Sequence, residues 1–174
     1  MLKARNLDVN FVGSANSGQD GFPDKDHEGH NGFTTSDILS FIPDWAKSAK
    51  PDLVLLMVGT NDVWHRGSIS DGAIRVPKII DEIFKVNPSA VVLCALITPL
   101  SPKFPDAAKV VDYIAALKEQ IENRQKLGQN IGIVDMFNAL NPLTDLDDEA
   151  HPNEEGCKKM ARTWMDALIR TVAL

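Results

Sequence analysis

The sequence of 174 residues has few cysteines, only a small excess of one charge, and no long apolar run. Its two cysteines, Cys94 and Cys157, permit at most one internal disulfide, which excludes a disulfide scaffold and favours two buried free thiols. The 18 basic and 24 acidic residues give a net charge of −6, which argues against a nucleic-acid or anionic-membrane partner. No apolar run approaches the roughly 20 residues of a membrane span, and no signal peptide is recognisable after Met1.

The chain does contain an alternation of short strands and longer helices. Hydrophobic residues make up 44% and charged residues 24%, which is the composition of one globular domain with a core. Nearly continuous apolar runs, typical of strands buried on both faces, cover residues 7–13, 53–59, 90–98 and 130–136. Apolar residues at helical spacing cover residues 36–49, 70–87, 105–127 and 153–170. The alternation predicts an α/β fold with a parallel sheet covered by helices on both faces.

One long irregular segment, residues 14–33, stands apart from this alternation. A loop of that length in a compact domain is typical of a functional segment. Its acidic and histidine residues suggest a metal cluster at first sight; they are Asp24, Asp26, His27 and His30. The segment lacks the paired histidines of an H-E-x-x-H site and contains the helix-breaking Gly29, so a polar loop near the active site is the favoured interpretation. No metal and no other cofactor is expected.

The segment DLDDEAHPNEEG, residues 145–156, places Asp148 three residues before His151. A histidine held next to a carboxylate is typical of a general base, because the carboxylate orients the ring and stabilises its protonated form. Pro152 fits the first turn of the helix that follows and helps to hold the base in place. A base of this kind requires a nucleophile to deprotonate.

Ligands of an open parallel sheet bind beyond the carboxyl ends of its strands. The run 53–59 ends in Gly59, which permits a sharp turn, and Asn61 follows with amide donors that can point into the crevice. The alternative is that Asn61 and Asp62 form only a turn and a helix cap, and spacing alone leaves both interpretations open. Gly32, just before a predicted helix, is a weaker candidate to offer its backbone N–H to an anion.

Together these pieces resemble the SGNH hydrolases, also called GDSL esterases. The matching motifs are HNGFTT with Gly32, VGTND with Gly59 and Asn61, and DDEAHPNEEG with Asp148 and His151. The stretch VNFVGSANSG, followed by DHEGHNGFTTSDI, further resembles the branch of carbohydrate esterases that deacetylate xylan. The resemblance implies a flavodoxin-like three-layer sandwich, with His151 as base, Asp148 as its orienting acid, and Asn61 and Gly32 as oxyanion donors. It implies a small-molecule or polysaccharide ester as the substrate.

The chain departs from the family in its nucleophile. The Gly-Asp-Ser block of the family lies after a first, central strand, which would precede Leu7, and no such block is present. Ser14 and Ser17 follow the second strand of the family, and Ser36 fits a helix cap. We therefore expect an N-terminally truncated SGNH domain over residues 1–174, inactive as it stands, with sheet order 7–13, a vacancy, 53–59, 90–98 and 130–136. A fragment or a truncated gene model is favoured over an evolved serine-less protein.

Three functions follow from this interpretation. The first is hydrolysis of acetylated carbohydrate or another small ester, the second is a lysophospholipase-type activity on lipid esters, and the third is binding of a saccharide or partner without catalysis. Trp64 and His65, just after Asn61, would line a sugar-binding rim or, with equal weight, pack in the interior. The oligomeric state and the compartment are not indicated, although a longer form of the chain is compatible with secretion.

Overall fold

The computed structural model describes residues 9–18, 21–66 and 69–171. Within these residues, the main sheet contains three parallel strands in the order β3 (Leu53–Leu56), β4 (Val91–Leu96) and β5 (Ile131–Asp135). Leu53 pairs with Val91, and Val92 pairs with Ile131. The predicted runs 53–59, 90–98 and 130–136 are therefore confirmed as neighbouring strands, in the predicted order.

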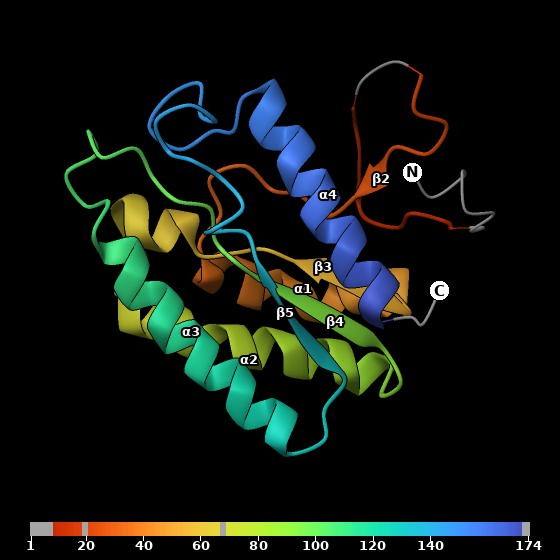
Figure 1. Ribbon diagram of the computed structural model, residues 1–174. Coiled ribbons are helices and arrows are strands. Elements are labelled where there is room, and N and C mark those ends of the chain that lie inside the picture. Colours follow the sequence, from red (N-terminus) through yellow and green to blue (C-terminus); the bar gives the residue numbers. More distant parts are fainter. Residues whose placement is uncertain (1–8, 19–20, 67–68, 172–174) are drawn as a thin grey trace.

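In the described part of the chain, four helices cover the two faces of this sheet, as predicted from the apolar spacing. They are α1 (Thr35–Ala49), α2 (Ile69–Val86), α3 (Lys109–Lys126) and α4 (Glu154–Thr171). Figure 1 shows α1, α2 and α3 on one side of the sheet and α4 on the other. The result is an α/β fold in three layers. None of the described helices is long and apolar enough to cross a membrane.

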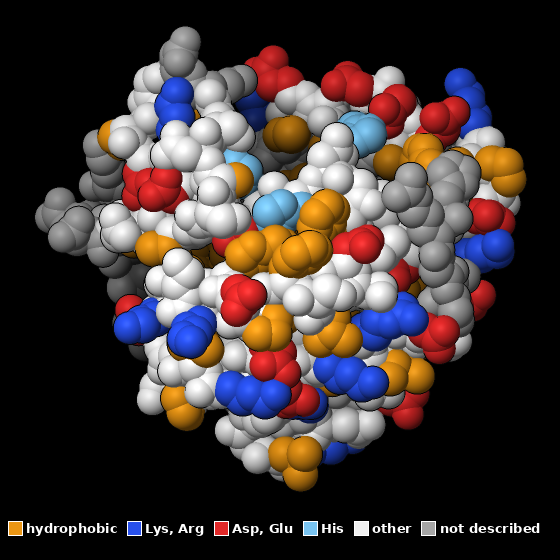
Figure 2. Space-filling model, turned by 180° about the vertical axis from the view of Figure 1, so that it is seen from behind, with side chains coloured by type: hydrophobic (Ala, Val, Ile, Leu, Met, Phe, Trp, Pro, Cys, Tyr) orange, Lys and Arg blue, Asp and Glu red, His pale blue; other side chains and the backbone are white. Residues whose placement is uncertain are grey.

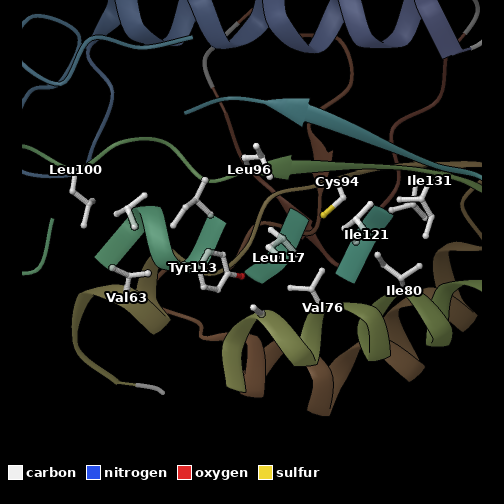
Figure 3. Packing of buried hydrophobic residues seen from close by; sticks show 14 of the residues in the cluster. Val63, Val76, Ile80, Cys94, Leu96, Leu100, Tyr113, Leu117, Ile121 and Ile131 are labelled. Carbon is white, nitrogen blue, oxygen red and sulfur yellow. The ribbon is translucent and has the colours of Figure 1, made fainter. Parts of the chain in front are cut away.

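The core follows from the alternation of side chains along β4, in which Val92 to Leu96 are all buried. Val92, Cys94 and Leu96 belong to the cluster formed with α2 and α3, whereas Leu93 and Ala95 pack with residues of β5 and α4. Figure 3 shows Cys94 pointing toward the helices that carry Val76, Ile80, Leu117 and Ile121. A strand that supplies both interior layers has no polar face, which explains its continuous apolar sequence.

The two cysteines are free, and they differ in their surroundings. Cys94 is buried in β4, and burial raises the pKa of its thiol to about 12. Cys157 is exposed, so the expectation that both thiols are buried is wrong for this residue. The reason is helix geometry: α4 buries Gly156 and Ala167, and Cys157 lies on the outward side of the same helix.

The predicted strand over residues 7–13 is wrong for the part that the structure describes. Residues 9–13 form no strand, and residues 7 and 8 lie outside the described residues. Val9, Phe11 and Val12 are exposed, and the Phe11 N–H donates to the Asp24 carboxylate at 2.7 Å instead of to a neighbouring strand. An apolar segment becomes a strand only where another strand satisfies its backbone groups. The next residues form a small antiparallel pair, β1 (Ala15–Asn16) with β2 (Asp26–His27).

The outer edge of β3 pairs with no strand in the described part of the chain, because β4 is the one strand that pairs with β3 there. Near this edge the side chains of Leu55 and Met57 are 40% and 38% exposed. An open strand edge with apolar neighbours is a template for pairing with a second molecule.

Replacing Leu55 by lysine is therefore expected to reduce self-association of the 174-residue chain, since a charge beside an open edge opposes strand pairing. Sedimentation velocity over a range of concentrations measures the effect. Val111→Lys is the matched control, because Val111 is 55% exposed on α3, away from the sheet edge. Equal association of the parent chain and both variants would contradict pairing through β3.

Candidate active site

The clearest candidate site is the contact between Asp148 and His151 in the loop that leads into α4. Asp148 Oδ2 lies 2.8 Å from His151 Nδ1. The other carboxylate oxygen accepts the backbone N–H groups of Ala150 at 2.8 Å and His151 at 2.7 Å. One side chain thus folds the turn and orients the ring, which is why a spacing of three residues suffices for the contact. Both side chains are accessible, with exposed fractions of 74% for His151 and 49% for Asp148.

The charge of Asp148 determines which ring nitrogen of His151 carries the proton. The backbone N–H groups of Ala150 and His151, followed by the ring of His151, lower the pKa of Asp148 to about 2. The carboxylate is therefore ionised near neutral pH and can only accept hydrogen bonds, so Nδ1 carries the hydrogen. The neutral ring then presents an unprotonated Nε2, which is the nitrogen that a general base uses.

This pKa shift predicts a dependence of stability on pH. A carboxyl group whose pKa is lower in the folded state stabilises the fold above its unfolded pKa of about 3.9, and that contribution is lost as the pH falls toward 2. We expect the urea midpoint to fall more between pH 5 and pH 2.5 in the parent chain than in Asp148→Asn. Asp147→Asn, at the exposed neighbouring position, is expected to behave as the parent. Equal losses in all three proteins would contradict the assignment.

Asn61 and the loop that contains Gly32 are in direct contact. The Asn61 side-chain Nδ2 donates one hydrogen to the carbonyl of Phe33 at 2.9 Å, which leaves its second N–H available. Gly32 has a φ of 76°, and an added Cβ would meet no atom within 4 Å, so the backbone there borders open space. Among the described residues the Gly32 N–H has no acceptor. The structure thus brings two of the predicted donors close together at the carboxyl edge of β3.

Asp62 connects the segment after β3 to the segment that begins α1. From the sequence, this role could not be distinguished from that of an ordinary turn and helix-cap residue. The Asp62 carboxylate is buried, and it accepts the Thr35 N–H at 2.8 Å and the Thr35 hydroxyl at 2.6 Å. Arg75 lies 3.8 Å away and balances part of the charge. The first turn of α1 is thereby attached to the exit of β3. Nothing in the sequence distinguished this aspartate, because its partner lies 27 residues earlier.

Gly59 is required by a close approach from α3. Its φ is 120°, and an added Cβ would lie 2.1 Å from the Tyr113 ring and hydroxyl. Tyr113 is fully buried, and its hydroxyl donates to the Val58 carbonyl at 2.9 Å. Burial, followed by the charge of Asp62, raises the pKa of Tyr113 well above its usual value, so the phenol stays protonated and keeps this hydrogen bond. Tyr113 therefore positions the strand end from which Asn61 emerges.

The two rim residues differ in what the structure describes. Trp64 is half-buried, packs against the core, and stacks on Phe104 with ring centroids 4.4 Å apart. This packing accounts for its position, and a role at a sugar-binding rim stays a prediction. His65 lies in the short helix η2 (Asp62–Arg66), and its side chain lies outside the described residues.

The expected lack of a serine nucleophile for His151 stays a prediction. None of them forms a hydrogen bond to that ring in the described part of the chain, and Ser68 lies outside it. Ser17 lies 2.8 Å from His27 Nε2. The Gly29 N–H donates to His27 Nδ1 at 3.0 Å, so Nδ1 is an acceptor and Nε2 carries the hydrogen. In this arrangement His27 donates to Ser17 and cannot deprotonate it.

The predicted polar loop is tied to α1 through His30. The imidazole stacks on Trp45 at a centroid distance of 4.1 Å and on Phe33 at 4.9 Å. Its Nε2 bonds to the Glu28 carboxylate at 2.6 Å. Figure 2 shows hydrophobic side chains gathered beside a histidine on the face opposite to that of Figure 1. Among the described residues, no three acidic, histidine or cysteine side chains are grouped as metal ligands.

Comparison with known proteins assigns the family. The GDSL-like lipase/acylhydrolase family model matches residues 5–159. A family 3 carbohydrate esterase from Clostridium thermocellum is 33% identical, with a TM-score of 0.85, and the match covers 97% of this chain and 81% of that one. A structure of an acetyl esterase mutant with an acetate ion is 28% identical, with a TM-score of 0.85 and coverage of 97% and 86%. The chain therefore belongs to the GDSL-like lipase/acylhydrolase family, a family of ester hydrolases, and is similar to carbohydrate esterases.

A multidomain esterase from Ruminococcus flavefaciens is 26% identical over 165 residues. The match covers 83% of this chain, and 21% of that esterase. This chain thus corresponds to about a fifth of the length of that larger protein.

Proposed function

We propose that this chain carries the base and the oxyanion donors of a serine ester hydrolase that removes acetyl groups from carbohydrate. The observation that carries the proposal is the 2.8 Å contact between Asp148 and the Nδ1 of His151, which leaves Nε2 free to accept a proton. The substrate class is supported by the names of similar proteins, a family 3 carbohydrate esterase and an acetyl esterase. The alternatives of lipid ester hydrolysis and of binding without catalysis are tested by the experiment below.

In the proposed reaction, a serine hydroxyl gives its proton to His151 Nε2 while its oxygen attacks the carbonyl carbon of the acetyl group. The resulting oxyanion accepts hydrogen bonds from the free Asn61 N–H and the Gly32 N–H. The intermediate then collapses, the bond to the sugar oxygen breaks, and that oxygen takes the proton from Nε2. Water, deprotonated by the same nitrogen, releases acetate from the serine and restores the hydroxyl.

The serine of this reaction is proposed to come from a segment that is not part of residues 1–174. In support, no described serine bonds to His151, and the outer edge of β3 has no described partner. A parallel strand seated on that edge would end at the same carboxyl edge as β3, and a serine after it would lie near Asn61. Residues 1–174 alone are accordingly proposed to be inactive, because a base and two donors cannot form an acyl-enzyme without the serine.

The test compares residues 1–174 with a longer form that includes the coding sequence upstream of Met1. Both are assayed on p-nitrophenyl acetate, acetylated xylan and a lysophospholipid, and on xylan for binding. We expect the longer form to release acetate and the 174-residue chain not to do so. Preference for the lysophospholipid would favour a lipid ester over acetylated carbohydrate as the substrate. Binding of xylan without turnover by both forms would favour a binding function over hydrolysis.

A further inference from the structure

Asp145 is a buried carboxylate at the base of the loop that carries His151. It is 2% exposed, and its Oδ2 accepts the Asn141 N–H at 2.7 Å and the Lys159 ammonium at 2.7 Å. Its Oδ1 accepts the Thr144 hydroxyl at 3.1 Å. The Asn141 N–H, followed by Lys159, lowers the pKa of Asp145, so the buried group is a carboxylate near neutral pH. Such a charge requires a fixed set of donors.

The backbone of Asp145 holds the far end of the same loop. Its carbonyl accepts the Asn153 N–H at 2.9 Å. Gly156, in the first turn of α4, approaches so closely that an added Cβ would lie 2.3 Å from this carbonyl oxygen. Asp145 is thus fixed by its side chain to the helix that follows the loop and by its backbone to the start of that helix.

His151 lies between these two attachments. The Asp147 N–H donates to the His151 carbonyl at 2.8 Å, and Leu146 forms a bridge with Pro152 across the loop. The middle of the loop is attached to the exit of β4, because the Ser101 N–H donates to the Glu149 carbonyl at 2.8 Å. The position of the His151 backbone therefore depends on where Asp145 is held.

Lys159 and Lys158 are neighbours on α4 with different partners. Lys158 bonds to Glu154 at 2.7 Å, a pair in which both side chains are more than half exposed. Lys159 reaches inward to Asp145, and it is the cation in contact with that carboxylate among the described residues. Exposed pairs within a helix contribute little, whereas removing Lys159, whose side chain is 36% exposed, leaves the 3% exposed Asp145 side chain without its cation.

We propose that the Lys159–Asp145 ion pair positions His151: it fixes the loop of residues 145–153 so that the ring keeps its contact with Asp148. Without Lys159 the carboxylate keeps the Asn141 N–H and the Thr144 hydroxyl but loses its cation. It is then drawn toward water, which displaces the start of the loop and, through Asp147 and Pro152, the backbone of His151. Lys159 does not touch the reacting atoms in this proposal. The importance of Lys159 for catalysis rests on the proposed role of His151 as base. The effect of Lys159 on the position of the His151 ring does not depend on that role.

The test reads the His151 ring directly by ¹⁵N NMR of histidine-labelled protein, which is practical because the chain has four histidines. His151→Ala identifies the signal. In the parent chain we expect the tautomer with hydrogen on Nδ1. In Lys159→Met we expect its population to fall at least about twofold, with exchange broadening, as the contact with Asp148 loosens. Lys159→Arg is expected to restore the parent signal, and Lys158→Met, the matched control, to leave it unchanged.

Lys159→Gln replaces the ammonium group with a neutral amide donor. This variant tests the proposal if Lys159→Met does not fold. A His151 signal identical to that of the parent in Lys159→Gln, with or without a loss of thermal stability, would overturn the proposal, because the pair would then serve the fold alone. A shifted or broadened His151 signal in Lys159→Gln, with the parent signal kept in Lys158→Met, supports it.

Activity is measured separately in the longer form. Lys159→Met is expected to lower kcat by about 10-fold to 100-fold with little change in KM, since a small displacement of a catalytic group has effects of this order. If His151→Ala leaves hydrolysis unchanged, the proposed function fails while the NMR result still tests the positioning. If His151→Ala abolishes hydrolysis and Lys159→Met leaves both kcat and the ring signal unchanged, the positioning fails alone.

Discussion

Replacing His151 by alanine is expected to lower kcat/KM for acetyl ester hydrolysis by about 10⁴-fold or more in the longer form that is proposed to supply the serine. The serine is a weak nucleophile near neutral pH, and the free Nε2 of His151 is the proposed acceptor of its proton. The loss should appear in kcat, because the ring acts on the reacting atoms and not on substrate binding. Initial rates with p-nitrophenyl acetate, corrected for the spontaneous reaction, measure it.

His27→Ala is the matched control for this experiment. His27 also lies beside a serine, Ser17, but its Nδ1 accepts the Gly29 N–H, so its Nε2 is a donor. We expect its activity to stay within about twofold of the parent, as for a residue outside the reacting atoms. If His27→Ala removed activity and His151→Ala did not, the base would have been assigned to the wrong histidine.

Replacing Gly59 by alanine is expected to lower the free energy of unfolding by about 3–5 kcal/mol, the combined cost of overpacking and of a non-glycine residue at positive φ. The added methyl group would overlap the buried Tyr113 ring at 2.1 Å, and the φ of 120° disfavours any residue with a Cβ. Since a domain is stable by only about 5–15 kcal/mol, this one substitution removes a large share of the stability. Urea unfolding followed by circular dichroism measures the change.

Gly128→Ala separates the two causes. Gly128 also has a positive φ, 81°, but an added Cβ would meet no atom within 4 Å. We expect a loss of about 1–2 kcal/mol there, from backbone strain alone. If both variants lost the same stability, the approach of Tyr113 would not be the reason for glycine at position 59.

The strands of the main sheet could be predicted because their apolar runs are intrinsic to the sequence. Residues 90–98 contain β4, and successive side chains of that strand point alternately into the two interior layers on either side of the sheet. Residues 7–13 have a similar composition, yet the described part of that run is not a strand. Apolar composition reports that a segment can be buried, whereas strand formation also requires a partner for its backbone groups, and a single segment carries no information about its partner.

The candidate site also has a part that could be predicted from the sequence and a part that could not. Asp148 and His151 are three residues apart, so one tight turn brings them together and local sequence was sufficient to predict the contact. The residues that hold the site were missed because their partners are distant along the chain. Tyr113 bonds to a carbonyl 55 residues earlier, Asp62 to Thr35 across 27 residues, and Lys159 to Asp145 across 14.

By itself the sequence determined the alternation of strands and helices and the Asp148–His151 pair, since each depends on residues that are neighbours along the chain or on a periodic apolar pattern. The order of the main strands followed from the family resemblance. Only the tertiary structure decided which glycine is crowded by Tyr113, which aspartates are buried with donors, and which lysine of α4 faces inward. The physical reason is that burial and hydrogen-bond partners depend on how separate elements pack, and that packing brings together residues whose types, taken singly, are common on any surface.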